Sequence, residues 1–405
     1  MPHSASATAA GLSAEAGSGL TPVVTFVFAV ACGAMVANIY YAQSLIGLIS
    51  PDLHLQTNLA GLIVTLTQLG YGAGLLFLVS LGDLVENRKL ILITSSGVIL
   101  GLVGVATSHS ADIYLLSSFV VGLCSVGAQM LVPLAAHLAP DRTRGRVIGN
   151  IMSGLLAGIM LARPLASFVA AYLGWRAIFS LSAAIMLGIV AVLWRVLPRR
   201  QPRPGLHYGH ILASTLAMFA RFPALRRRAA YQGLLFAAFS LFWTAAPLML
   251  RDSFGLSQQG IALFALAGAG GALAAPLAGR LADRGLTRPA TALALVCVIF
   301  SFLAAGFAAA AGQVLLLAVA AIALDSAVQT NQVLSQRIIY SLAPEARGRL
   351  NAAFLTAIFA CGSVSSAVST YAYVEGGWWL TALIGAGLGA IALALFAGEL
   401  LGRRA

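Results

Sequence analysis

The sequence predicts an all-α membrane protein whose transmembrane helices form two similar six-helix bundles. Three observations support this fold class: the composition, the number of long apolar segments, and a repeat between the two halves of the chain. Of the 405 residues, 60% are hydrophobic and only 9% are charged, whereas about 25% of the residues of soluble domains are charged. These few polar side chains cannot coat a water-exposed surface, so we expect the lipid bilayer to be the solvent.

The long apolar segments give the number of spans. A helix needs roughly 20 apolar residues to cross the hydrocarbon core of a bilayer, and a membrane strand would show period-two alternation, which is missing here. We count twelve segments of sufficient length, at residues 22–48, 59–81, 90–108, 113–137, 147–173, 176–197, 229–250, 259–279, 289–311, 313–338, 350–373 and 377–400. The pattern therefore predicts twelve transmembrane helices.

A repeat relates the two sets of six segments. The stretch at residues 138–146 (LAPDRTRGR) recurs at residues 342–349 (LAPEARGR), and Gly174–Trp175 recurs as Gly377–Trp378. Parallel repeats of this kind imply two bundles with a substrate path between them. We expect a disordered cytoplasmic tail at residues 1–21, bundles at residues 22–197 and 229–405, and a cytoplasmic linker at residues 198–228. The apolar part of that linker, His210 to Phe222, fits an interfacial helix and a plain linker equally well.

The basic residues predict the orientation of the chain in the membrane. The net charge is +12, and 21 of the 24 Lys and Arg residues fall in the tails or in the even-numbered connections between segments. By the positive-inside rule, both termini lie in the cytoplasm of a bacterial-type inner membrane. The positive charge then faces anionic lipid and need not bind nucleic acid. All four cysteines fall inside predicted spans, so we expect neither a disulfide framework nor a metal site, and no cofactor.

Two cytoplasmic connections carry a motif that resembles the major facilitator superfamily. Residues 279–285 (GRLADRG) match the glycine, aspartate and basic residues that this family has after its eighth span, and residues 82–89 (GDLVENRK) form a degenerate copy after the second span. The resemblance covers essentially the whole chain and implies the major facilitator fold. It also implies a conformational latch that holds the outward-open state, formed here by Asp83, Arg88, Asp283, Arg284, Arg347 and Arg349. The alternative for Asp83 is an acidic cap on a positive-inside turn.

Two further strings are similar to the drug:proton antiporter and sugar-efflux branch of that superfamily. They are residues 38–43 (NIYYAQ) in the first span and residues 158–164 (GIMLARP) in the fifth span. The chain departs from the branch pattern at Ala162 and Arg163, where glycines are usual, and at Ser118, where an arginine is frequent. The resemblance implies proton-coupled efflux of small apolar, amphipathic or sugar-like molecules.

Charged residues within the spans are rare, so the two that occur are candidate functional residues. Asp325 alone among the acidic residues lies near mid-membrane, and Arg163 alone among the basic residues lies deep in a span. A charge there costs roughly 3 kcal/mol or more, so both should face a wet cavity or a partner. Asp325, Gln329, Gln332 and Gln336 are spaced by four, three and four residues, which places them on one helix face. We expect this face to line the central path.

These residues suggest roles, each with a plainer alternative. Asp325 is the candidate proton-coupling residue, or else an ordinary packing carboxylate; Arg163 contacts substrate, or else forms a buried structural pair. The aromatic row in the seventh span suits apolar cargo, although such rows more often serve helix packing. The candidate substrate-binding residues are Asn38, Tyr41, Gln43, Arg163, Gln329, Gln332, Phe239 and Trp243.

The functional classes follow from these features. Our first hypothesis is a proton-driven exporter, and our second is a facilitator or uptake symporter of the same fold that transports a small metabolite. The third, an intramembrane enzyme or sensor, lacks support because the sequence contains no Walker A loop, HExxH helix or GxSxG elbow. We therefore expect a transporter that is not an enzyme, acts as a monomer, and has protons, lipids and a small-molecule substrate as its partners.

Overall fold

The computed structural model describes residues 21–198 and 207–402, which form helices and their connections without any β-strand. The side chains of Asp83, Ala272 and Glu345 are outside this description. Residues 1–20 of the predicted tail lie outside the described residues. Residues 199–206 of the predicted linker also lie outside them.

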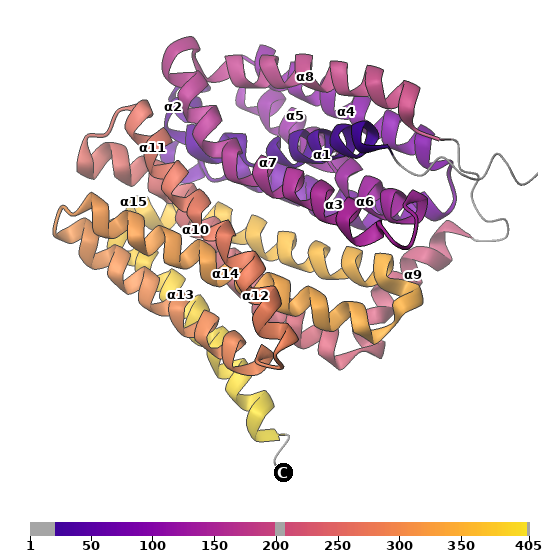
Figure 1. Ribbon diagram of the computed structural model, residues 1–405. Helices are drawn as coiled ribbons and strands as arrows, with labels where there is room; N and C mark the ends of the chain where they lie inside the picture. The colour runs from indigo at the N-terminus through magenta and orange to yellow at the C-terminus, as the bar shows by residue number, and fades with distance from the viewer. Residues whose placement is uncertain (1–20, 199–206, 403–405) are drawn as a thin grey trace, which may run out of the picture.

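Helices of the N-terminal half run back and forth across the molecule (Figure 1). They are α1 (Pro22–Ala37), η1 (Tyr41–Leu45), α2 (Ile46–Asp52), η2 (Thr57–Leu59), α3 (Leu62–Phe77), η3 (Val79–Asp83), α4 (Asn87–Thr107), α5 (Ala111–Cys124), α6 (Gly127–Leu138), α7 (Arg144–Leu173) and α8 (Trp175–Val196). The first predicted span is bent by 44° between α1 and the η1–α2 segment. Asn38 ends α1, and its side chain accepts a hydrogen bond from Ser182 of α8.

The C-terminal half follows after a connecting helix and is also built of helices. They are α9 (Tyr208–Arg221), α10 (Pro223–Phe254), α11 (Gln258–Ala269), η4 (Gly270–Leu273), α12 (Ala274–Asp283), α13 (Thr287–Ala310), α14 (Val314–Leu342), η5 (Pro344–Ala346) and α15 (Arg347–Gly402). Helix α9 covers the apolar part of the predicted linker, and its place at the membrane interface stays a prediction. Helix α10 begins at Pro223, six residues before the predicted span, because proline suits the first turn of a helix.

The helices account for the predicted spans. Ten helical stretches among the described residues are long and apolar enough to cross a membrane. Some of them join consecutive helices, as α5 with α6 and α11 with α12. The bent segment from α1 to α2 makes eleven. Helix α15, with 56 residues, is too long for one span and contains a non-helical residue, Gly377, with φ 62°. Gly174, its repeat partner in the sequence, has φ 81° between α7 and α8. Both positions need the left-handed backbone that glycine adopts without strain, and the break at Gly377 divides α15 into the eleventh and twelfth spans.

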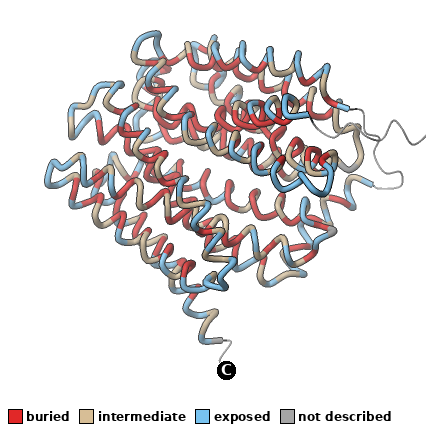
Figure 2. Tube along the Cα trace, in the orientation of Figure 1, coloured by how far each residue is buried: buried red, intermediate tan, exposed pale blue. Residues whose placement is uncertain are grey.

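Burial follows the membrane-protein pattern rather than that of a soluble protein. Buried residues gather where helices face one another, and exposed residues cover the outer faces (Figure 2). Many of the exposed residues are large and apolar, such as Phe26, Leu100 and Leu315, as expected for side chains in contact with lipid. Helix α10 is the exception, since 94% of its most apolar stretch is buried. It packs against α14 and α15 and also reaches η1 and α2 of the other half.

Candidate substrate-transport site

A cavity of about 1220 Å³ lies between the two halves. Arg163 and Asp325 line its inner part. From there it extends toward one end of the molecule, where its wall includes Asn87 at the start of α4, His210 of α9 and Arg347 at the start of α15. The positive-inside pattern predicts that this end, which carries the basic connections, faces the cytoplasm.

Hydrogen bonds between the halves close the opposite end of the path. Arg251 Nη1, near the end of α10, donates to the carbonyl oxygen of Gly47 in α2 at 2.9 Å. Gln258 Nε2, at the start of α11, donates to the carbonyl oxygen of Ser44 at 3.0 Å and to Ser167 Oγ at 3.1 Å. The cavity therefore opens at one end only.

A second seam between the halves runs along α3 and α15. The Gly61 amide donates to Thr370 Oγ1 at 2.9 Å, and Thr65 Oγ1 donates to the carbonyl oxygen of Ser363 at 3.0 Å. Further along, Gln68 Nε2 donates to Ser240 Oγ of α10 at 3.0 Å. Small hydroxyl residues allow the helices to approach closely and supply polar contacts in lipid, which explains the Ser- and Thr-rich composition of the eleventh span.

Arg163 and Asp325 meet at the inner end of the cavity, one from each half. Arg163 Nη2 lies 3.6 Å from Asp325 Oδ2, and the side chains are 3% and 8% exposed. Trp243 Nε1 of α10 donates to Asp325 Oδ1 at 2.8 Å. The guanidinium carbon of Arg163 also lies 3.9 Å from the centre of the Trp243 ring and 5.1 Å from that of Phe239, which indicates cation–π stacking.

Neighbouring residues hold this pair in place. Ser44 Oγ donates to the carbonyl oxygen of Arg163 at 3.1 Å, which ties α7 to η1. Gly271 packs so closely against α14 that a Cβ atom there would lie 2.4 Å from Asp325 Cβ, and one on Gly268 would lie 2.2 Å from the Trp243 ring. Two glycines thus give Asp325 and Trp243 the room they occupy.

The polar row of α14 lies where the sequence spacing predicts. Gln329, Gln332 and Gln336 line the cavity together with Asp325. Asn331 faces away from this row and is fully buried; its Nδ2 donates to Gln232 Oε1 of α10 at 2.8 Å. The prediction that Arg163 and Asp325 face the central cavity agrees with this geometry, while the roles of these residues in binding or coupling stay predictions.

Of the other predicted substrate-binding residues, only Phe239 lines the cavity. Tyr41 packs edge-on against Phe179 of α8 at 6.3 Å, so it belongs to the core of its own half. Gln43 is fully buried without a hydrogen-bond partner for either amide atom among the described residues. Four of the predicted residues are not among those that line the cavity: Asn38, Tyr41, Gln43 and Trp243. The first three come after Ala37, where the α-helix ends. Trp243 contacts Asp325 without lining the cavity.

Sequence reasoning missed several residues of the cavity wall, and Gln232 and Tyr40 lie among them. Gln232 precedes Phe236 by four residues and Phe239 by seven, so extending the aromatic row of α10 by one turn would have found it. Tyr40 lines the cavity and lies within electrostatic range of both Arg163 and Asp325. Tyr40 belongs to the family-like string at residues 38–43, but helical spacing does not mark it, because it lies in the turn after α1.

Three of the predicted latch residues contact residues outside the predicted latch in this conformation. Asp283 forms a 2.5 Å ion pair with Arg337 of α14, and Arg88 Nη2 donates to the carbonyl oxygen of Trp194 at 2.5 Å. Arg347 Nε donates to the carbonyl oxygen of Tyr340. The carboxylate of Asp83 lies outside the described side chains. The latch, which belongs to the outward-open state, therefore stays a prediction.

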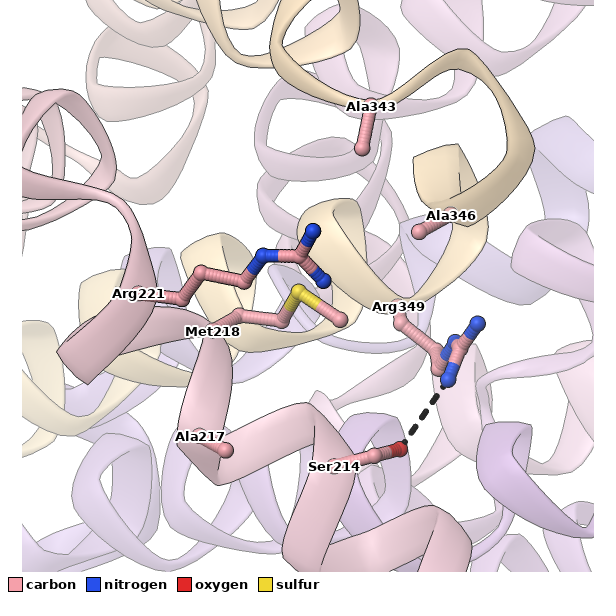
Figure 3. Close-up of a pocket in the computed structure, with 7 residues that line it drawn as sticks. All are labelled: Ser214, Ala217, Met218, Arg221, Ala343, Ala346 and Arg349. Atoms are coloured by element: carbon pink, nitrogen blue, oxygen red, sulfur yellow. Dashed lines mark hydrogen bonds between the residues drawn. The ribbon is translucent and has the colours of Figure 1, made fainter.

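Arg349, another predicted latch residue, lies at a small second cavity beside α9. This cavity, about 210 Å³ in volume, is bordered by Ser214, Met218 and Arg221 of α9 and by the connection between α14 and α15. Arg349 Nη1 donates to Ser214 Oγ at 3.1 Å (Figure 3). The contact fastens the connecting helix to the start of α15. Among the described residues, no cluster of three or more potential metal-ligating side chains occurs here or elsewhere.

Comparison with protein families identifies this architecture. The model of the Major Facilitator Superfamily matches residues 26–365 and, in a second match, residues 229–404. The chain belongs to the major facilitator superfamily. Both the predicted family and the predicted fold class are thereby confirmed.

Relatives place the chain among bacterial transporters of this superfamily. It is 41% identical over 368 residues to "Uncharacterized transporter YgaY" of Escherichia coli O157:H7, covering 91% of this chain and 93% of that one. It is 31% identical over 351 residues to "Probable transporter SCO4007" of Streptomyces coelicolor, covering 84% and 79%. A match of 26% identity over 175 residues, 43% of each chain, links it to the purine ribonucleoside efflux pump NepI of Salmonella enteritidis.

Solved structures agree on the fold. A D-xylose–proton symporter aligns with a TM-score of 0.71 at 16% identity, covering 91% of this chain and 96% of that one. The nucleoside transporter NupG, in a D323A mutant, aligns with a TM-score of 0.70 at 15% identity, covering 92% and 99%. At such identities the similarity concerns the fold alone.

Proposed function

We propose that this chain is a proton-coupled secondary transporter that works by alternating access, with Asp325 as the group that carries the proton. One observation carries the proposal: Asp325 and Arg163 form a buried ion pair that joins the two halves at the closed end of the cavity. Every reorientation of the halves must move these two groups relative to one another or to the solvent. A change in the charge of Asp325 therefore changes the free energy of that movement.

The orientation follows from the charge pattern. Both termini and the connections rich in arginine lie in the cytoplasm, so the cavity of this conformation opens inward. The seals formed by Arg251, Gln258 and Gly61 then close the periplasmic side. Lipids surround the apolar outer faces, and we propose that the chain acts as a monomer without catalytic activity, in the inner membrane.

Export in exchange for protons is the first candidate direction. It is favoured by the similarity of residues 38–43 and 158–164 to efflux transporters and by the relative that is named an efflux pump. Its cargo would be a small apolar, amphipathic or sugar-like molecule, held against Phe236 and Phe239, whose rings stack at 5.5 Å, and oriented by Gln329 and Gln332.

Uptake together with protons is the second candidate, and a specific feature of the pair favours it. An anion bound to Arg163 would deprive Asp325 of its counter-ion, and the carboxylate would then take up a proton. Empty carrier and fully loaded carrier would both have no net charge at the pair, whereas a half-loaded carrier would bury an unpaired charge, which is costly. This charge balance describes co-transport.

The sign of proton movement separates the two directions. Everted membrane vesicles that contain the protein and are acidified inside are exposed to a compound panel, and the internal pH is followed with a fluorescent dye. An exchanger passes protons out as the compound enters the vesicle, so the gradient collapses faster. A co-transporter produces substrate-dependent proton flux in the same direction as the substrate. If compounds cross at rates that no pH gradient alters, proton coupling is wrong and the chain is a facilitator.

A further inference from the structure

Arg163 has hydrogen-bond donors that the protein does not use. Its Nε and Nη1 atoms are buried and have no hydrogen-bond partner among the described residues. The 3.6 Å separation from Asp325 Oδ2 is too long for a hydrogen bond, so it is an ion pair only. An unsatisfied buried donor costs roughly 1–3 kcal/mol, and more when it is charged. Such a cost is retained where a ligand satisfies the donors, and Arg163 lines the cavity.

The geometry of a guanidinium group defines what would satisfy it. Nη2 presents two parallel N–H bonds together with Nε on one edge of the group and together with Nη1 on the other, and either edge matches the two oxygens of a carboxylate, sulfonate or phosphate. Asp325, the natural competitor, is held by Trp243 through Oδ1 and approaches Arg163 only through Oδ2. Displacement of Asp325 from Nη2 thus frees a complete edge of Arg163 for a second acidic group, with Nε or Nη1 as the second donor.

The remaining charges of the cavity favour the same class of ligand. The lining residues with a permanent positive charge are Arg163, Arg347 and Arg349, against a single carboxylate, Asp325, within the part of the chain that the structure describes. Arg347 and Arg349 lie at the start of α15, at the open end of the cavity. A positive entrance raises the local concentration of anions and repels cations.

Apolar rings provide the rest of the binding surface. Phe236 stacks on Phe239 at 5.5 Å and contacts Phe359 at 4.8 Å, and all three line the cavity. At about 1220 Å³, the cavity is large enough for a drug-sized ligand. The surface suits a ligand that joins an apolar body to one acidic group.

We propose that the substrate is an amphipathic organic anion whose acidic group binds Arg163 through Nη2 together with Nε or Nη1, while Asp325, displaced as counter-ion, takes up the proton. The inference rests on the proposed coupling role of Asp325, and for this substrate class it selects co-transport. Substrate binding and proton binding then strengthen one another. The bound anion neutralises Arg163, the bound proton neutralises Asp325, and either event leaves the other group without its counter-ion.

Few other groups can interfere with this linkage. Arg163 of α7 and Tyr40, after α1, are the titratable groups whose charges act on Asp325. Helix α10 presents Trp243, and α11 presents Gly268. Cys297 of α13 donates to the carbonyl oxygen of Ala323, two residues before Asp325. His210 lines the same cavity from α9, at its open end.

Three probes with the same body test the charge of the substrate. They are 3-phenylpropane-1-sulfonate, its primary sulfonamide and 3-phenylpropylamine, and their binding to the purified full chain is measured by equilibrium dialysis between pH 5 and pH 8. We expect the sulfonate to bind at least tenfold more tightly than the neutral sulfonamide at pH 5. Because the sulfonate stays charged throughout, any loss of affinity on raising the pH reports on the protein, and we expect up to tenfold per pH unit. Equal or tighter binding of the amine would overturn the proposal.

Charge-matched variants identify the residues. In Asp325→Asn, the sulfonate should bind tightly at every pH, since the competitor is gone. In Arg163→Gln/Asp325→Asn, which keeps the pair neutral and similar in size, sulfonate affinity should fall at least tenfold relative to Asp325→Asn, with sulfonamide affinity unchanged. Retained sulfonate affinity in the double variant, or no sulfonate binding in either the parent or Asp325→Asn, refutes the inference. Correct binding without any proton flux would instead refute the coupling role proposed above.

Discussion

The two halves come closest where α3 begins, at Gly61. A Cβ atom on this residue would lie 2.1 Å from the carbonyl oxygen of Ser366 and 3.0 Å from Thr370 Oγ1, both in the other half. The backbone of Gly61 is helical, with φ −58° and ψ −25°, so alanine would cause no strain within its own half. Gly61→Ala therefore acts only on the conformation that closes the periplasmic end.

The size of the effect follows from the overlap. Inserting a methyl group into a packed contact costs typically about 1–3 kcal/mol, and this cost disappears when the halves separate. The equilibrium should shift by about 5- to 150-fold toward the conformation that is open at the periplasmic end. Gly72→Ala is the matched control, because it lies on the same helix against α15, but its nearest contact would be Phe359 Cβ at an ordinary 3.5 Å.

Distances between spin labels measure this equilibrium. Gln56 and Glu375 are exposed, one in each half, and lie five residues from Gly61 and Thr370 in the sequence, so they suit labelling. Gly61→Ala should populate a longer distance than the parent, and Gly72→Ala should match the parent. An unchanged distance distribution in Gly61→Ala would show that this seam does not separate during transport, which contradicts alternating access through it.

Two further predictions concern close packing and the periplasmic seal. Gly158→Ala should destabilise the N-terminal half by about 1–3 kcal/mol, because a Cβ atom there would lie 2.2 Å from the Gly33 carbonyl oxygen; thermal unfolding should show this, whereas Gly149→Ala, on an open face of α7, should leave the unfolding temperature unchanged or higher. Gln258→Ala removes two hydrogen bonds between the halves, worth about 1 kcal/mol net, or roughly fivefold in the same equilibrium; a spin-label distribution identical to that of the parent would contradict the proposed seal.

Most of the fold was predictable because membrane spans leave a strong signal. Length and hydropathy define the helices, and the repeated Gly174–Trp175 and Gly377–Trp378 pairs mark equivalent breaks with positive φ. What could not be predicted is local. The bend after Ala37 accompanies a tertiary contact, that of Asn38 with Ser182, which no periodicity encodes.

The candidate site was predictable where residues are chemically rare. A single arginine and a single aspartate in apolar spans must pair with each other or contact water. The spacing of Asp325, Gln329, Gln332 and Gln336 places them on one face of α14. Asn38, Tyr41 and Gln43 were selected by similarity to a family string, which gives identity without direction. Asn38 and Tyr41 contact α8 of their own half, because the α-helix ends at Ala37. A sequence match beyond the end of a helix is therefore a weaker guide than spacing within one.

Coupling through Asp325 is tested most directly by gradient-driven uptake into proteoliposomes. A gradient of two pH units supplies about 2.7 kcal/mol per proton, enough for about 100-fold accumulation. For a compound that the parent accumulates in this way, Asp325→Asn should bring the concentration ratio to one while exchange of labelled for unlabelled compound continues, because asparagine keeps size and hydrogen bonding but cannot change charge. Accumulation by Asp325→Asn equal to that of the parent would contradict the proposed mechanism.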